Sequence, residues 1–161
     1  MMAGVGRSFD FTGRAALAAM GLCLVACSND DDLPPGWEDA EPVAELTQSS
    51  CSEGAPGKHD EHATFAPGEK RVDVEYLDAH FRCEQRVEGF YKDSGGRLDV
   101  LVQPVEMHPS SVTRCDCLYD IGVAIEDIRA GSRTVTLFRR WDDLNDPNDP
   151  VTIDSESIVV E

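Results

Sequence analysis

CDCLYDIGVAI, residues 115–125, is the stretch that decides the fold of this chain. Apolar or sulfur-containing side chains occupy every second position in it: Cys115, Cys117, Tyr119, Ile121, Val123 and Ile125. Acidic or small residues lie between most of them. Strict alternation is the period of a β-strand, whose successive side chains point to opposite faces, and differs from the 3.6-residue period of a helix. We therefore predict a half-buried β-strand here.

Shorter alternating segments lie on both sides of this strand. Turn residues at Glu126–Ser132 precede a second alternating segment, Arg133–Trp141. The other strands are expected at Val72–Tyr76, Phe81–Tyr91, Leu98–Val102, Val151–Ile153 and Ile158–Val160, with a hairpin turn at Asp93–Gly96. About six or seven short strands, with turns between them and no long helical pattern, predict an all-β fold, an antiparallel β-sandwich.

Part of this pattern is similar to a known group of proteins. The motif Cys115-x-Cys-Leu-Tyr-Asp-Ile-x-Val-x-Ile, followed by Ile128-x-x-Gly131 and an alternating strand, resembles the C-terminal half of small secreted bacterial lipoproteins with immunoglobulin-like β-domains. The similarity covers about residues 115–139. It implies an immunoglobulin-like sandwich and carries no active site with it.

Four cysteines lie in the expected domain: Cys51, Cys83, Cys115 and Cys117. An even number of cysteines in an exported chain favours two disulfides. A bond between Cys115 and Cys117 would close a strained small ring, and cysteines two apart in a strand point the same way. We therefore expect each of them to pair with one of Cys51 and Cys83, which leaves two connectivities open.

The first residues read as an export signal. Two basic residues, Arg7 and Arg14, precede an uninterrupted apolar run from Ala15 to Ala26. As a helix this run would span about 18 Å, too short for the ~30 Å hydrocarbon core of a bilayer. It ends in Leu-Val-Ala-Cys27, which resembles the lipobox of bacterial lipoproteins. That resemblance implies cleavage before Cys27, a lipid on its sulfur, and acyl chains such as palmitate that hold the protein on a membrane.

The chain is accordingly divided into three parts. Residues 1–26 are expected to be a lipoprotein signal peptide, residues 27–50 the lipidated N-terminus with a flexible acidic tether, and residues 51–161 the disulfide-stabilised β-sandwich domain. Ser28 follows the lipidated cysteine, where aspartate commonly favours inner-membrane retention. We therefore expect an exported protein on the outer membrane, at its periplasmic face or at the cell surface.

The charge of the chain limits its partners. From Cys27 onward it has 12 basic and 30 acidic residues, a formal charge of −18. So negative a surface repels phosphate backbones and anionic headgroups, which disfavours nucleic acids and any lipid contact beyond the anchor. It favours cations or basic partners, and it also keeps an exported domain soluble.

Two segments contain residue types that ligate metals. His59 and His62 lie close together and would join Cys51, His80 and Cys83 in a sulfur and nitrogen site. The acidic segment Asp142–Asp149 offers oxygen donors for calcium, with Asp143, Asn145 and Asp149 as the candidates. Against calcium, Pro147 stands at a ligand position and Asn148 where the loop needs glycine, so an acidic surface turn is the simpler interpretation.

Another short motif is similar to part of a protease site. Asp93-Ser94-Gly95-Gly96 matches the sequence around the nucleophile of trypsin-like proteases, and His80 with Cys83 faintly resembles their histidine motif. A serine nucleophile needs a base within hydrogen-bond reach, and that family spreads its residues over two barrels, which this chain is too short to form. A hairpin turn explains the same four residues.

These observations favour a non-enzymatic protein without a cofactor. We expect a lipid-anchored cell-envelope protein that acts as a binding, structural or interaction module, with an unknown protein or envelope partner. The alternative is a periplasmic metal-binding lipoprotein that uses His59 and His62, together with cysteine thiolates if these are not oxidised.

Overall fold

The computed structural model describes residues 33–52, 61–106, 115–141 and 150–161. These residues form nine strands, and among them no helix is long and apolar enough to cross a bilayer. The strands are β1 (Glu41–Pro42), β2 (Glu45–Gln48), β3 (His62–Gly68), β4 (Arg71–Arg82), β5 (Val87–Asp93), β6 (Arg97–Pro104), β7 (Asp116–Ile125), β8 (Gly131–Arg139) and β9 (Val151–Val160). The predicted all-β fold is confirmed.

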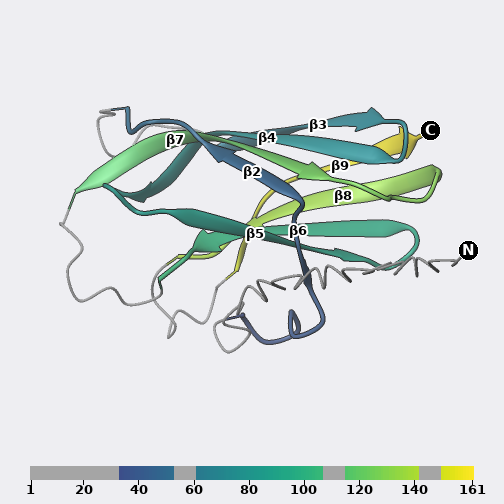
Figure 1. Cartoon of the computed structure of the whole chain (residues 1–161), viewed down its shortest axis with the longest axis horizontal. Helices are drawn as coiled ribbons and strands as arrows, with labels where there is room; N and C mark the ends of the chain where they lie inside the picture. The colour runs from purple at the N-terminus through teal and green to yellow at the C-terminus, as the bar shows by residue number, and fades with distance from the viewer. Residues whose placement is uncertain (1–32, 53–60, 107–114, 142–149) are drawn as a thin grey trace, which may run out of the picture.

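The strands form two sheets that pack face to face (Figure 1). One sheet has the order β1-β5-β6-β8-β9 and the other the order β2-β7-β4-β3. Every pairing is antiparallel except that of β6 with β8, which is parallel. Between these two strands the chain runs through β7 in the opposite sheet, so β8 enters beside β6 in the same direction. The sandwich is therefore as predicted, apart from this one parallel pair.

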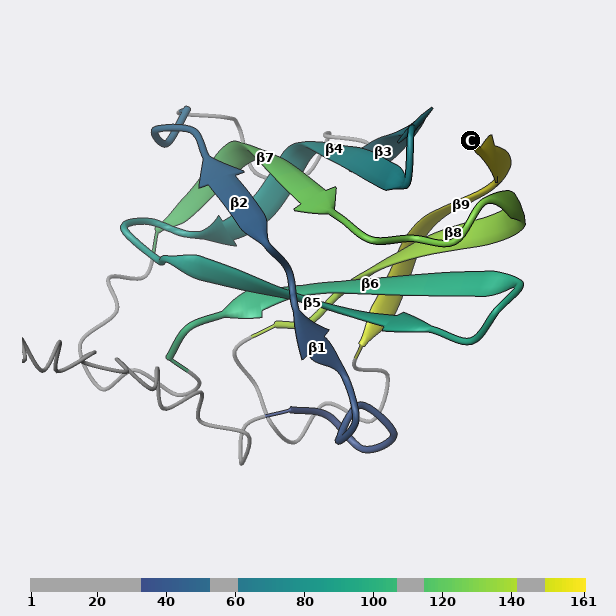
Figure 2. The same ribbon diagram turned by 45° about the vertical axis from the view of Figure 1, so that its right-hand side comes forward.

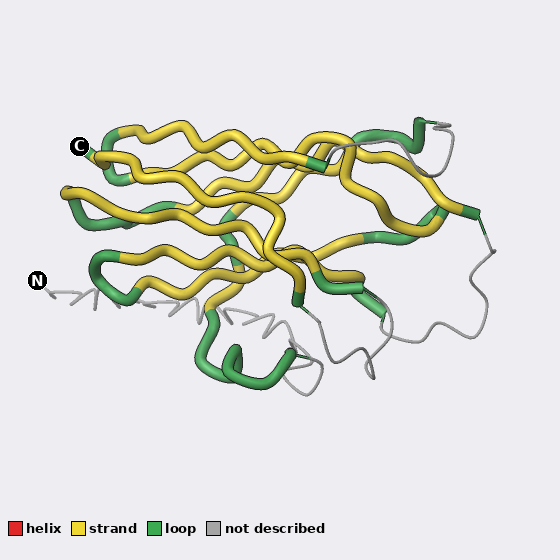
Figure 3. The backbone as a smooth tube through the Cα atoms, turned by 180° about the vertical axis from the view of Figure 1, so that it is seen from behind, coloured by secondary structure: helices red, strands yellow, loops and turns green. Residues whose placement is uncertain are grey.

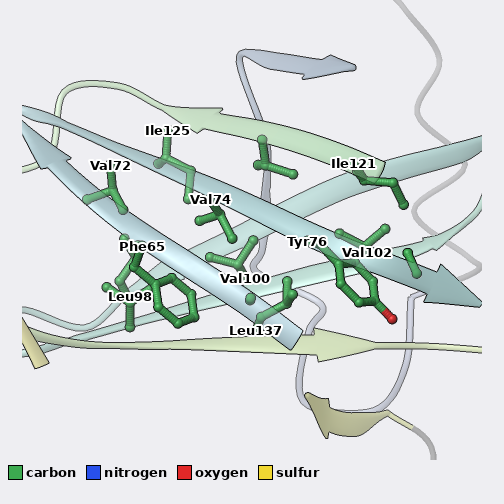
Figure 4. Packing of buried hydrophobic residues seen from close by; sticks show 14 of the residues in the cluster. Phe65, Val72, Val74, Tyr76, Leu98, Val100, Val102, Ile121, Ile125 and Leu137 are labelled. Carbon is green, nitrogen blue, oxygen red and sulfur yellow. The ribbon is translucent and has the colours of Figure 1, made fainter. Parts of the chain in front are cut away.

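The core lies between the two sheets and is built on the pairing of β4 with β7. In this ladder Val72 faces Ile125, Val74 faces Val123, and Tyr76 faces Ile121. These side chains point inward against Leu98, Val100, Val102 and Leu137 of the other sheet, and almost none of their surface remains exposed (Figure 4). Burying one such aliphatic side chain contributes about 1.5–3 kcal/mol. The predicted strand at residues 115–125 is thus half of the central ladder.

Three differences from the predicted strands have local causes. The segment Phe81–Tyr91 is split because the chain turns between β4 and β5, where Glu84 adopts a positive φ of 63°. The two C-terminal segments are parts of one strand, β9, which pairs along the whole of β8 with one irregularity after Leu137. Strands β1, β2 and β3 were not predicted. Nine described strands therefore replace the expected six or seven.

The segment from Leu33 to Gln48 is folded and is not the flexible tether expected for residues 27–50. Trp37 is only 5% exposed and packs with Phe90 and Leu101 on the outer face of the five-stranded sheet. Strand β1 then pairs with β5, and β2 pairs with β7 of the other sheet, so this segment connects the two sheets (Figure 2). The tether prediction failed because an isolated tryptophan and two short, largely exposed strands give no periodic signal. Residues 1–32 lie outside the described residues, and Cys27 with them.

The packing of Trp37 predicts a large loss of stability on its removal. In Trp37→Ala the free energy of unfolding should fall by about 3 kcal/mol, because large-to-small substitutions at buried aromatic positions lose both burial and packing. Val159→Ala is the matched control: Val159 is 64% exposed, and its truncation should change stability by no more than about 0.5 kcal/mol. Urea unfolding followed by fluorescence or circular dichroism measures both. Equal effects would show that residues 33–40 do not contribute to the folded core.

Candidate functional site

Two disulfides join the ends of the central strands. Cys83, which follows β4, is bonded to Cys115, which precedes β7. Cys117, at the start of β7, is bonded to Cys51, which follows β2. Each of Cys115 and Cys117 thus pairs with one of the two upstream cysteines, as predicted. The bond between Cys83 and Cys115 spans 32 residues, and the bond between Cys51 and Cys117 spans 66. Cross-links that close loops of this length lower the entropy of the unfolded chain, which stabilises the fold by about 4 kcal/mol for each bond.

The four sulfurs form one cluster. Cys117 Sγ lies 3.0 Å from Cys83 Sγ, although these two atoms belong to different disulfides. The Sγ atoms of Cys51, Cys83 and Cys117 all lie within 4.8 Å of one another. In the described part of the chain, this is the one group of His, Cys, Asp or Glu side chains close enough to share a metal ion. As disulfide sulfurs they are not thiolates, which is the form of cysteine that binds metals.

Of the residues predicted as ligands beside the cysteines, the described part of the chain contains His62 and His80, and neither lies in the sulfur cluster. His62 is exposed at the start of β3, and His80 lies in β4. Asp154, an acidic residue shortly after the predicted calcium segment, lies in β9 and accepts a hydrogen bond from the Ala63 backbone N–H at 3.4 Å. The other candidates, His59, Asp143, Asn145 and Asp149, lie outside the described residues. The metal site therefore stays a prediction.

A second polar group, which we call the Glu61 clamp, lies at the free edge of β4 and consists of Glu61, Tyr76, His80 and Arg139. The pairing with β3 reaches only to Leu77, opposite His62. Beyond that point β4 still pairs with β7, but no described strand lies on its other side. Glu61 Oε1 takes the place of a strand there: it accepts hydrogen bonds from the His80 backbone N–H at 2.8 Å and from the Tyr76 hydroxyl at 2.7 Å.

Arg139 completes the clamp from the opposite sheet. Its Nη1 atom donates to the His80 carbonyl at 3.3 Å, and its Nη2 atom lies 3.5 Å from Glu61 Oε2. The Glu61 and Arg139 side chains are only 18% and 17% exposed, so solvent weakens this ion pair less than it weakens a surface pair. The clamp therefore fastens the end of β8 to the edge of β4. Residues 61 and 139 are far apart in the sequence and carry no motif, so sequence analysis did not find it.

The side chains next to the clamp are aromatic and acidic. Trp141 stacks on Phe81 with ring centres 6.1 Å apart and lies below the Arg139 guanidinium. The His80 ring lies 5.2 Å from the Trp141 ring, and His80 Nε2 is 3.6 Å from Asp116 Oδ2. With its carboxylate, guanidinium and phenol engaged with one another, the clamp is an arrangement that holds the two sheets together.

The protease-like motif forms the β5–β6 turn, as the hairpin interpretation predicted. Asp93 Oδ1 accepts hydrogen bonds from the Gly95 backbone and from Arg133, both at 2.8 Å. Gly95 has a φ of +84°, which favours glycine at this position. Ser94 donates to the Arg97 carbonyl through both its backbone N–H and its hydroxyl. Ser94 and Asp93 therefore serve the turn, and His80 lies in the other sheet beside Asp116 and Trp141.

The outer face of the four-stranded sheet carries an acidic groove. This groove, with a volume of about 370 Å³, runs over small side chains and is lined by Glu45, Thr47, Ala66, Arg71, Asp73, Val74, Glu75, Gly122, Val123 and Ala124. Gly122 forms part of its floor, where a Cβ atom would lie only 2.7 Å from Thr47 Oγ1. Arg71, its one basic residue, is paired with Asp73 at 2.8 Å and with Glu126 at 3.1 Å. The groove thus keeps an excess of negative charge.

The clamp predicts a pH dependence of stability. Burial raises the pKa of the Tyr76 phenol far above its usual range, and the Glu61 carboxylate adds to the shift. Above pH ~10 the unfolded chain loses this proton while the folded chain keeps it. The contribution of Tyr76 to the free energy of unfolding should therefore be constant below pH ~10 and should fall by about 1.4 kcal/mol per pH unit above it.

Tyr76→Phe should remove this part of the slope and leave the part due to other groups, such as Tyr91, whose pKa burial and the Glu41 hydrogen bond raise to about 12. Urea unfolding of both proteins between pH 9 and 11 measures the difference. Identical slopes would show that Tyr76 ionises as readily in the folded chain as in the unfolded chain.

Comparisons of this chain with family models, with curated proteins and with solved structures found no match. Its function is therefore inferred from its own residues.

Proposed function

We propose that this chain is an exported protein, held on the outer membrane through lipid on Cys27, whose β-sandwich is a non-enzymatic binding or interaction module of the cell envelope. The observation that carries the proposal is the sequence Leu-Val-Ala-Cys27 at the end of a twelve-residue apolar run, upstream of a domain closed by two disulfides. Such bonds persist in oxidising compartments outside the cytoplasm, where a lipoprotein resides.

The folded segment at Leu33 limits the distance between the domain and the membrane. Leu33 stands only six positions after Cys27, and a fully extended chain covers about 3.5 Å per position. The domain would therefore begin within about 21 Å of the lipid instead of at the end of a long tether. Residues 33–40 pack on the outer face of the five-stranded sheet (Figure 1). We therefore infer that this face points toward the membrane.

The outer face of the four-stranded sheet would then point away from the lipid. It carries the acidic groove, with Glu45, Asp73 and Glu75 on its rim. A formal charge of −18 from Cys27 onward repels anionic headgroups and nucleic acids, and it attracts basic surfaces over about one Debye length. We therefore assign this face to a basic protein or envelope partner.

The anchor is tested by the intact mass of the protein extracted from membranes without reductant. We expect a chain that begins at Cys27 and carries a diacylglyceryl group and a further acyl chain. Reduction should add about 4 Da, the hydrogens of two disulfides. Cys27→Ser should abolish the lipid and release the protein from the membrane fraction, while Cys23→Ser is the control that keeps it. An unlipidated N-terminus in the unsubstituted protein would refute the anchor.

The interaction face is tested by photo-crosslinking of the full, lipidated chain in cells. A photoreactive phenylalanine analogue replaces Glu75 on the outer face of the four-stranded sheet, or Thr134 on the outer face of the other sheet as the control. Both residues are exposed. We expect a discrete protein adduct from position 75 and none from position 134, because only the first face would point to the partner. Adducts from position 134 alone would assign the interaction to the opposite face.

A further inference from the structure

We propose that the two disulfides form one thiol–disulfide exchange unit that accepts two electrons from an external dithiol. After the exchange Cys51 and Cys115 are thiols, and Cys83 is bonded to Cys117. The proposal does not depend on the lipid anchor or on the acidic groove. It rests on the position of Cys117, whose sulfur is bonded to Cys51 and lies 3.0 Å from the sulfur of Cys83.

The four cysteines differ in exposure, so an external thiolate can reach some of their sulfurs and not others. Cys51 and Cys115 are exposed, Cys83 is half-buried, and Cys117 is 1% exposed. Thiol–disulfide exchange requires a thiolate to reach a sulfur of the bond that it breaks. An external thiolate can therefore reach Cys51, whereas Cys117 is shielded from solvent and lies within reach of the second disulfide.

In the first step an external thiolate attacks Cys51 Sγ. A mixed disulfide forms with Cys51, the bond from Cys51 to Cys117 breaks, and its electron pair leaves on Cys117 as a thiolate. This thiolate is formed inside the fold with Cys83 Sγ as its neighbour.

In the second step the Cys117 thiolate attacks Cys83 Sγ. The bond from Cys83 to Cys117 forms, the bond from Cys83 to Cys115 breaks, and the electron pair leaves on Cys115, which takes a proton from water. The second thiol of the external dithiol then attacks its own sulfur in the mixed disulfide and releases Cys51. The dithiol is oxidised by two electrons, and the protein keeps one disulfide and gains two thiols.

The product bond preserves the fold. Cys83 follows β4 and Cys117 is the second residue of β7, so the new disulfide still joins the two central strands. The segment that carries Cys51 keeps the Ser52 backbone hydrogen bonds to Leu118, at 3.0 and 3.3 Å. The sandwich therefore stays closed, and the two thiols are on Cys51 and Cys115, which are exposed. The end of the molecule where β4 stops and β7 starts is on the left of Figure 1 and on the right of Figure 3, which shows the backbone from behind.

The relay is tested on the full chain with limiting dithiothreitol, followed by an acid quench, denaturation, alkylation with N-ethylmaleimide and peptide mapping. The species with two thiols should carry label on Cys51 and Cys115, with Cys83 bonded to Cys117. Label on Cys51 and Cys117, or on Cys83 and Cys115, would show that one original disulfide stayed intact and would overturn the proposal. Direct passage to four thiols would also overturn it.

A variant tests the same step without a reductant. Cys51→Ser leaves Cys117 without its partner, and we expect label on Cys115 as well as on Cys117, because Cys117 and Cys115 then compete for Cys83. Label confined to Cys117 would contradict the relay. Cys83→Ser is the matched control: it removes the sulfur that Cys117 attacks, so label should be found on Cys115 alone.

Discussion

The ladder between β4 and β7 is the constraint on which the rest of the structure depends. Its register sends Val72, Val74, Ile121 and the other alternating side chains of both strands into the core. A shift of one residue would turn every one of these side chains to the outer face. The same register places Cys117 opposite Phe81 on the inner face, where its sulfur meets Cys83. The burial of the apolar side chains and the position of the cysteines thus require the same register between β4 and β7.

The edges of the two sheets show how the sandwich is closed without further strands. Beyond Leu77, side chains take the place of a strand at β4, with Glu61 at its N–H and Arg139 at its carbonyl. Gln48 does the same at β5, since its side chain accepts from the Val87 N–H and donates to the Gln85 carbonyl. Both sets of side-chain hydrogen bonds connect one sheet to the other. They satisfy backbone groups that would otherwise offer an open edge to another chain.

Sequence analysis found those features that are periodic or local. The long alternation at residues 115–125, the turn at Asp93–Gly96 and the disulfide pairing rule are of this kind, because each is set by a few neighbouring residues. Strand β3 was missed although its alternation is real, because Pro67 interrupts it and the preceding residues are polar. The parallel pair of β6 with β8 and the pairing of Glu61 with Arg139 depend on tertiary contacts between distant segments. Their residues show no spacing from which either could be inferred.

The acidic character of the chain bears on the interaction face and on the sulfur cluster alike. Asp116 lies between Cys115 and Cys117, and Glu84 follows Cys83. Negative charge beside a sulfur disfavours a thiolate and repels an acidic thiol reagent such as glutathione. A reductant that brings its own basic residues would offset both effects, since complementary charge raises the rate at which two proteins meet. The exchange that we propose would therefore favour a basic protein dithiol over an anionic small thiol, and the basic partner that we propose for the acidic groove has the same kind of surface.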